Sequence, residues 1–126
     1  MSAVYYLGWI IAIVLIVVGI WALVSPQTLA REYGVQVEGH EAHAFVRATG
    51  IRDVALGVVL AATAYLHLLW LLVIIAVVGI AVSIADLWVV SHHGGVRHFH
   101  RAHAIHASGI VAFVLVIAMA LFAIGR

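Results

Sequence analysis

Two arginines and an aspartate lie in residues 46–57, a segment that begins as a polar surface sequence and ends as an apolar helix. Arg47, Arg52 and Asp53 therefore fall where the chain enters a strongly hydrophobic environment. A lone charge in a membrane helix costs about 2.5–3.5 kcal/mol on insertion scales, which favours pairing inside the protein. We therefore consider a structural ion-pair network that fixes helix register, a ligand-binding site and a proton-transfer site, with chance placement at the membrane interface as a fourth possibility.

Two further apolar segments each carry an ionisable residue. Asp86 lies late in the third long apolar segment, and His106 lies early in the fourth. A buried carboxyl group is a proton donor and an imidazole a proton acceptor, so the predicted catalytic residues are Asp53, Asp86 and His106. The predicted ligand-binding residues are Arg47, Arg52, Thr49, His103 and Trp21.

The composition is that of a membrane protein. Of the 126 residues 67% are hydrophobic, mean hydropathy is +1.24, and only 9% are charged, against about 25% in a soluble domain. The absence of cysteine excludes disulfides and cysteine-based zinc sites. A net charge of +1 gives no basic surface, so we expect no nucleic-acid partner.

The apolar segments predict an all-α protein with four transmembrane helices in one domain, residues 1–126. Runs of about twenty apolar residues are long enough to cross a bilayer. The predicted elements are a first span at 4–24, a short polar helix at 26–33, a connector at 35–39, a second span at 41–66, a tight turn at His67, a third span at 68–90, a loop at 91–96 and a fourth span at 98–124.

Four spans place both termini on one side of the membrane. Arg31, Arg97 and Arg101 belong to the opposite side, while Arg126 stays with the termini. Because arginine-rich loops face the cytoplasm, we expect a multi-pass protein of the inner (plasma) membrane with both termini external.

Helix rise predicts that the polar residues share one depth. Counted from the terminal side at about 1.5 Å per residue, Asp53 lies about 20 Å deep, Asp86 about 26 Å and His106 about 27 Å. Thr49 and Trp21 come to about 26 Å, and Arg47 to about 29 Å. We therefore expect one polar layer in the cytoplasmic half of the bilayer. In it, Asp53 and Asp86 would neutralise Arg47 and Arg52.

Six histidines lie close together in the sequence, namely His92, His93, His98, His100, His103 and His106. Three-residue steps along a helix rotate each side chain by about 60° from the last, so His100, His103 and His106 do not face one ion. No His-Glu-x-x-His pattern accompanies them. We therefore predict no metal and no haem or other cofactor, and interpret the histidines from His92 to His100 as a hydrated surface cluster.

The segment Gly-Ile-Arg-Asp-Val-Ala-Leu-Gly at residues 50–57 resembles the signature of a group of small bacterial four-helix membrane proteins of unknown function, which are DoxX-like in size and topology. Asp86 and either His103 or His106 also agree with that group's pattern. The resemblance covers most of the chain. It implies a four-helix membrane fold and no established activity.

Three functions remain open at this point. The first is a binding or accessory protein whose buried arginine, aspartate and histidine pocket, in the cytoplasmic half of the bundle, holds a lipid headgroup, a quinone or a small anion, with arginine as the recognition cation. The second is an intramembrane acid–base enzyme without a cofactor, an isomerase or cyclase acting on an isoprenoid-like substrate. The third is a structural subunit of a membrane complex, or a homo-oligomer. A continuous proton pathway is disfavoured because the external half of the spans lacks ionisable residues.

Overall fold

The protein is a bundle of four long α-helices with one short helix. The computed structural model describes residues 2–33, 35, 37–93 and 99–125, apart from the side chains of residues 93 and 99–102. Its helices are α1 (Ala3–Val24), α2 (Pro26–Glu32), α3 (His40–Tyr65), α4 (Leu69–His93) and α5 (Phe99–Ile124). The predicted all-α class and the short helix after the first long one are confirmed.

Three of the helices are long and apolar enough to cross a membrane. These are Ala3–Val24, Leu69–His92 and His103–Ile124. They indicate a multi-pass membrane protein. The other long helix, α3, carries Glu41, Arg47, Arg52 and Asp53 and is not among these candidates. The assignment of α3 as a fourth span therefore remains a prediction.

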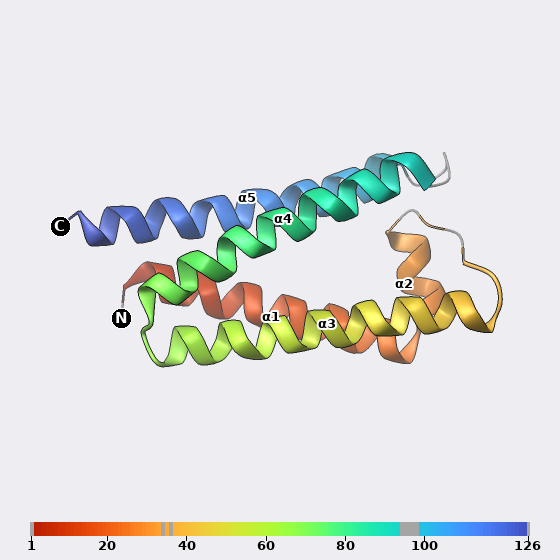
Figure 1. Ribbon diagram of the computed structural model, residues 1–126, viewed down its shortest axis with the longest axis horizontal. Coiled ribbons are helices and arrows are strands. Elements are labelled where there is room, and N and C mark those ends of the chain that lie inside the picture. The colour runs from red at the N-terminus through yellow and green to blue at the C-terminus, as the bar shows by residue number, and fades with distance from the viewer. Residues whose placement is uncertain (1, 34, 36, 94–98, 126) are drawn as a thin grey trace.

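The long helices associate as two pairs. Figure 1 shows α1 running beside α3 and α4 beside α5, with both termini and the turn between α3 and α4 at one end of the bundle. Helix α2 lies at the other end, against α1 and α3. Contact between the two pairs is much less extensive than contact within either pair.

Glycines bring α1 and α3 into backbone contact. A methyl group on Gly50 would lie 2.6 Å from both the Ala22 Cβ and the Gly19 carbonyl oxygen, and one on Gly57 would lie 2.9 Å from the Ala12 carbonyl oxygen. We call this contact the α1–α3 seam. Small residues are what allow membrane helices to approach so closely.

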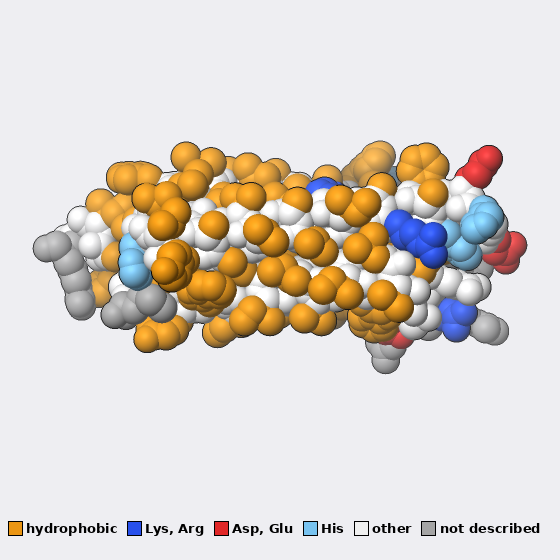
Figure 2. All heavy atoms as spheres, turned by 90° about the horizontal axis from the view of Figure 1, so that it is seen from below, with side chains coloured by type: hydrophobic (Ala, Val, Ile, Leu, Met, Phe, Trp, Pro, Cys, Tyr) orange, Lys and Arg blue, Asp and Glu red, His pale blue; other side chains and the backbone are white. Residues whose placement is uncertain are grey.

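The exterior of the bundle is apolar. Large hydrophobic side chains are exposed on each of the four long helices, for example Val17, Ile51, Trp70 and Leu121. Figure 2 shows such side chains along the visible face, with charged side chains concentrated near one end. An aqueous protein rarely exposes so large a continuous apolar surface, which agrees with a lipid environment.

The ends of the helices mostly follow the sequence, with one correction. His67 has a φ of 55° in the tight turn between α3 and α4, and its carbonyl accepts a hydrogen bond of 3.0 Å from the Tyr5 hydroxyl. Residues 91–93, predicted as loop, instead complete the last turn of α4. The Ser91 hydroxyl and the His92 ring donate to the Leu87 and Trp88 carbonyls, at 2.7 and 2.8 Å, which supports that turn. The rest of the predicted loop, and His98, lie outside the described residues.

Candidate functional site

Arg52 links the two helix pairs through two carboxylates. Its Nε and Nη2 both donate to Asp53 Oδ1 at 3.2 Å, and Nη2 also donates to Asp86 Oδ2 on α4 at 3.3 Å. The Asp53 side chain is 9% exposed, while that of Asp86 is 34% exposed. Asp53 is thus the deeply buried member, and Asp86 presents the more accessible carboxylate.

His106 and Tyr33 lie beside this ion-pair network. Their rings are tilted with centroids 5.1 Å apart. His106 is only 7% exposed, and its Nε2 atom is buried with no hydrogen-bond partner among the described residues. A buried nitrogen without a partner is costly, and it requires an explanation such as a bound ligand or an ordered water. We call Tyr33, Arg52, Asp53, Asp86 and His106 the polar cluster.

Two cavities meet at the polar cluster. The first has a volume of about 390 Å³ and lies between α2, the start of α3 and the late part of α4. The second, of about 400 Å³, lies between the two helix pairs and extends along α1 as far as Leu7. Both cavities are lined by Tyr33, Asp86 and His106, and the remaining walls of both are mostly apolar.

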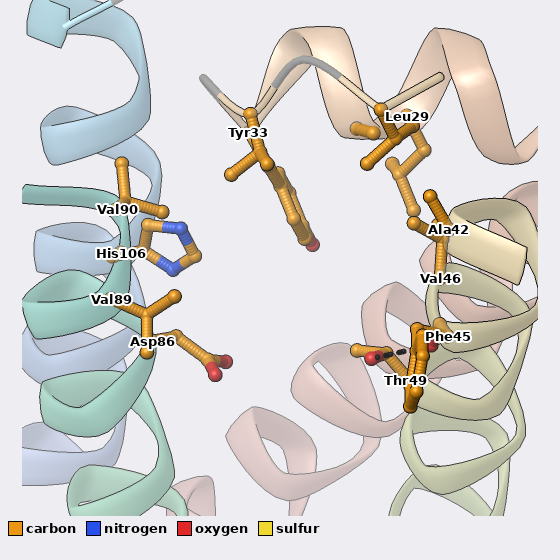
Figure 3. Close-up of a pocket in the computed structure, with 13 residues that line it drawn as sticks. Leu29, Tyr33, Ala42, Phe45, Val46, Thr49, Asp86, Val89, Val90 and His106 are labelled. Carbon is orange, nitrogen blue, oxygen red and sulfur yellow. Dashed lines mark hydrogen bonds between the residues drawn. The ribbon is translucent and has the colours of Figure 1, made fainter. Parts of the chain in front are cut away.

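Figure 3 shows how the first cavity is built. His106 and Asp86 lie on one wall, and Val46, Phe45 and Thr49 lie on the opposite wall. Tyr33 descends between these walls from the end of α2, with its hydroxyl group pointing into the open space. The short helix therefore closes one end of the cavity and contributes a polar group to it.

Burial raises the pKa of Tyr33 to about 12. The main cause is desolvation of the phenolate, and the negative charges of Asp53 and Asp86 act in the same direction, while Arg52 opposes them. Tyr33 therefore keeps its proton at neutral pH and can donate a hydrogen bond to a bound molecule.

The polar cluster contains four of the eight residues that the sequence singled out. Arg52, Asp53, Asp86 and His106 come together from three helices, and Thr49 lines the first cavity. The other three lie elsewhere.

Arg47, His103 and Trp21 line neither cavity. Arg47 is exposed and forms no ion pair with a described residue, so the prediction that it shares the aspartates with Arg52 is wrong. The two arginines are five residues apart, a spacing that turns their side chains to different faces of α3. His103 is hydrogen-bonded to Ser91 at 2.9 Å, and Trp21 is 41% exposed on the outside of α1.

Tyr33 is the site residue that sequence analysis missed. Leu29 and Ala30 lie four and three residues before Tyr33, and both spacings place side chains on the same side of a helix as Tyr33. That spacing was available in the sequence and indicates that the tyrosine turns toward the bundle.

Among the described residues, no three histidine, aspartate or glutamate side chains are grouped so that they could hold a metal ion. The side chains of His93, His98 and His100 are outside the described part of the chain. The expectation that the histidine-rich segment holds no metal therefore stays a prediction.

The fold and the site define a small helical membrane protein with a polar cluster between two helix pairs. The chain belongs to a family known as domain of unknown function DUF4267, whose model matches residues 12–121. No curated protein and no solved structure matches the chain significantly. Membership of a family of unknown function agrees with that part of the resemblance described above, whereas the likeness to DoxX-like proteins remains a prediction.

Proposed function

We propose that this protein binds a lipophilic small molecule between its two helix pairs, as a binding or accessory protein of the membrane. The apolar part of the ligand lies in the second cavity, and its polar end meets Tyr33, Asp86 and His106. The observation that carries the proposal is that two mostly apolar cavities share these same three polar residues. Ligand sites are typically concave and apolar, with a few convergent polar groups.

The buried His106 Nε2 supports a bound polar group in particular. This nitrogen has no partner among the described residues and belongs to a side chain that lines both cavities, so it offers a hydrogen bond that a ligand can complete. In this proposal α3 is the fourth membrane span, with Arg52 neutralised between Asp53 and Asp86. The polar cluster then lies in the cytoplasmic half of the bilayer, and both termini are external.

A second candidate is the acid–base enzyme acting on an isoprenoid-like substrate. One observation favours it, because a carboxyl group, an imidazole and a phenol all line the same cavities. Such groups move protons without a cofactor. Conversion of a lipid extract by the purified protein would separate the enzyme from the simple binding protein.

Native mass spectrometry of protein purified from its own membrane tests the binding proposal. Ala112 on α5 lines the second cavity, and Ala118 on the same helix is exposed. Ala112→Phe should fill the cavity and remove a co-purified molecule, while Ala118→Phe should retain it. If the wild-type protein carries no small molecule, or if both variants retain it equally, the cavity is not a binding site.

A further inference from the structure

The cavities carry an excess of negative charge. Among the described residues that line them, the groups that ordinarily carry charge at neutral pH are one arginine and two aspartates. Arg52 donates to both carboxylates, so its positive charge is already shared between Asp53 and Asp86. Counted with both aspartates ionised, Tyr33 protonated and His106 neutral, the polar cluster has a net charge of −1.

This balance disfavours an anionic ligand. The bonds to the aspartates use Nε and Nη2 of Arg52, so a phosphate or carboxylate would meet Arg52 at its Nη1 group and would lie near two carboxylates that already share this one counter-ion. Like charges in a weakly polar environment repel strongly, since little solvent screens them. The expectation that arginine recognises an anionic headgroup is therefore difficult to reconcile with the bonds that Arg52 makes.

Two residues that line both cavities instead offer hydrogen-bond acceptors. Asp86 is the more accessible carboxylate, at 34% side-chain exposure, and lines both cavities. His106 is 7% exposed over the whole residue, and its Nε2 has no hydrogen-bond partner among the described residues. In the tautomer that carries its proton on Nδ1, Nε2 accepts a hydrogen bond. Figure 3 shows the two residues on the same wall, facing the Tyr33 ring.

We propose that the ligand is an amphiphile with a single protonated amine at its polar end. The ammonium group donates to the Asp86 carboxylate and to His106 Nε2, and it restores charge neutrality to the polar cluster. The Tyr33 ring adjoins this position, and an aromatic face attracts a cation. The apolar chain follows the second cavity along α1 toward Leu7. This inference rests on the proposed binding function and specifies the chemistry of its ligand.

The binding of four ten-carbon amphiphiles tests whether the site prefers a protonated amine. Decylamine, decyltrimethylammonium, decanol and decyl sulfate are measured by equilibrium dialysis at pH 7 against protein in phosphatidylcholine nanodiscs, with empty nanodiscs subtracted. We expect decylamine to bind at least tenfold more tightly than decanol. The quaternary ammonium, which has the charge but no N–H donor, should fall between them, and decyl sulfate should bind weakest.

Asp86→Asn isolates the contribution of the charge. The substitution keeps the side-chain shape and leaves the Arg52–Asp53 bonds available, so affinity for decylamine should fall about tenfold while decanol binding is unchanged. Glu41→Gln is the matched control, because Glu41 is an exposed carboxylate on α3 that lines neither cavity. It should leave all four affinities as they are. Circular dichroism verifies that both variants are folded.

The outcomes separate the inference from the function on which it rests. If decanol and decyl sulfate bind as tightly as decylamine, the amine specificity is wrong and the binding function survives. If none of the four binds above empty nanodiscs and no molecule co-purifies with the protein, the binding function itself fails. The order of affinities in the wild-type protein decides the question even if Asp86→Asn does not fold.

A protonated amine can belong to a single-chain amphiphile or to an ethanolamine lipid headgroup. Replacing half of the phosphatidylcholine by phosphatidylethanolamine distinguishes these sources. Unchanged decylamine binding identifies a single-chain amine as the ligand. A decrease of several-fold, attributable to competition, identifies the lipid headgroup.

Discussion

Helix α3 packs against two other long helices, α1 and α4, and the two contacts differ in kind. Along the α1–α3 seam, Gly50 and Gly57 bring backbone against backbone, and no space remains for a methyl group. Toward α4, the same helix makes few contacts and is joined to it by the Arg52–Asp86 ion pair beside a cavity of about 400 Å³. The seam therefore holds a helix pair together, while the separation between pairs leaves room for a site.

The difference between these two helix contacts has a physical basis in the lipid environment. Lipid chains are as apolar as leucine, so the hydrophobic effect does little to drive one membrane helix against another. Close van der Waals packing and polar bonds must do so instead. The α1–α3 seam is held by close van der Waals packing, and the interface between the pairs relies more on polar bonds.

Gly50→Leu should have the largest effect on stability, because it breaks the seam. Even a Cβ at this position would lie 2.6 Å from the Gly19 carbonyl oxygen, which belongs to the backbone and cannot rotate away. We expect a loss of about 3 kcal/mol, at the upper end of the cost of overpacking a core. Unfolding in mixed detergent micelles titrated with sodium dodecyl sulfate measures it.

Ala48→Leu provides the control for this substitution. Ala48 is exposed on the same helix, two residues from Gly50, and the added side chain would face outward. The free energy of unfolding of the Ala48→Leu variant should stay within about 0.5 kcal/mol of the wild-type value, as for most surface changes. Equal losses in the two variants would show that the seam is not a determinant of stability.

Arg52→Gln should have a smaller effect, because it cuts the bond between the pairs and leaves the seam intact. Asp53, whose side chain is 9% exposed, would lose its counter-ion. Breaking a fully buried ion pair costs about 3–5 kcal/mol, but the Arg52 side chain is 40% exposed, so we expect about 1–2 kcal/mol. The same micelle titration measures the loss.

The control for Arg52 is Arg47→Gln. Arg47 is exposed and has no ion pair with a described residue, so its removal should leave stability nearly unchanged. A loss as large as that of Arg52→Gln would contradict the assignment of the network to Arg52 alone.

Much of the arrangement could be predicted from the sequence because depth is a simple count. Helix rise places Asp53, Asp86 and His106 at similar levels, and residues of all three helices line the second cavity. The direction in which each side chain points around its helix axis was harder to predict. Arg47 lies at a suitable depth, but its angle around α3 separates it from Arg52, and Trp21 faces outward on α1 although its depth is suitable as well.

A polar pocket could be predicted from the sequence, but the number, size and extent of the cavities could not. They depend on how far the α4–α5 pair separates from the α1–α3 pair, a distance that no residue spacing specifies. The role of α2 was also missed, because a helix of seven residues gives a weak periodic pattern. Its contribution becomes evident only where Tyr33 reaches the cavity that Asp86 and His106 also line.

Titration of Tyr33 should have the smallest effect on the structure, because it changes neither the α1–α3 seam nor the ion pairs. The tyrosine difference spectrum between wild type and Tyr33→Phe should have its midpoint at about pH 12, above the ordinary value of 10 for a tyrosine pKa. The folded protein keeps this proton while the unfolded chain releases it near pH 10, so Tyr33 makes the folded state less stable as pH rises from 10 to 12. Asp86→Asn should lower the midpoint, because it removes one of the negative charges that oppose formation of the phenolate. A midpoint near pH 10 in the wild-type protein would mean that Tyr33 is hydrated and is not buried between the helix pairs.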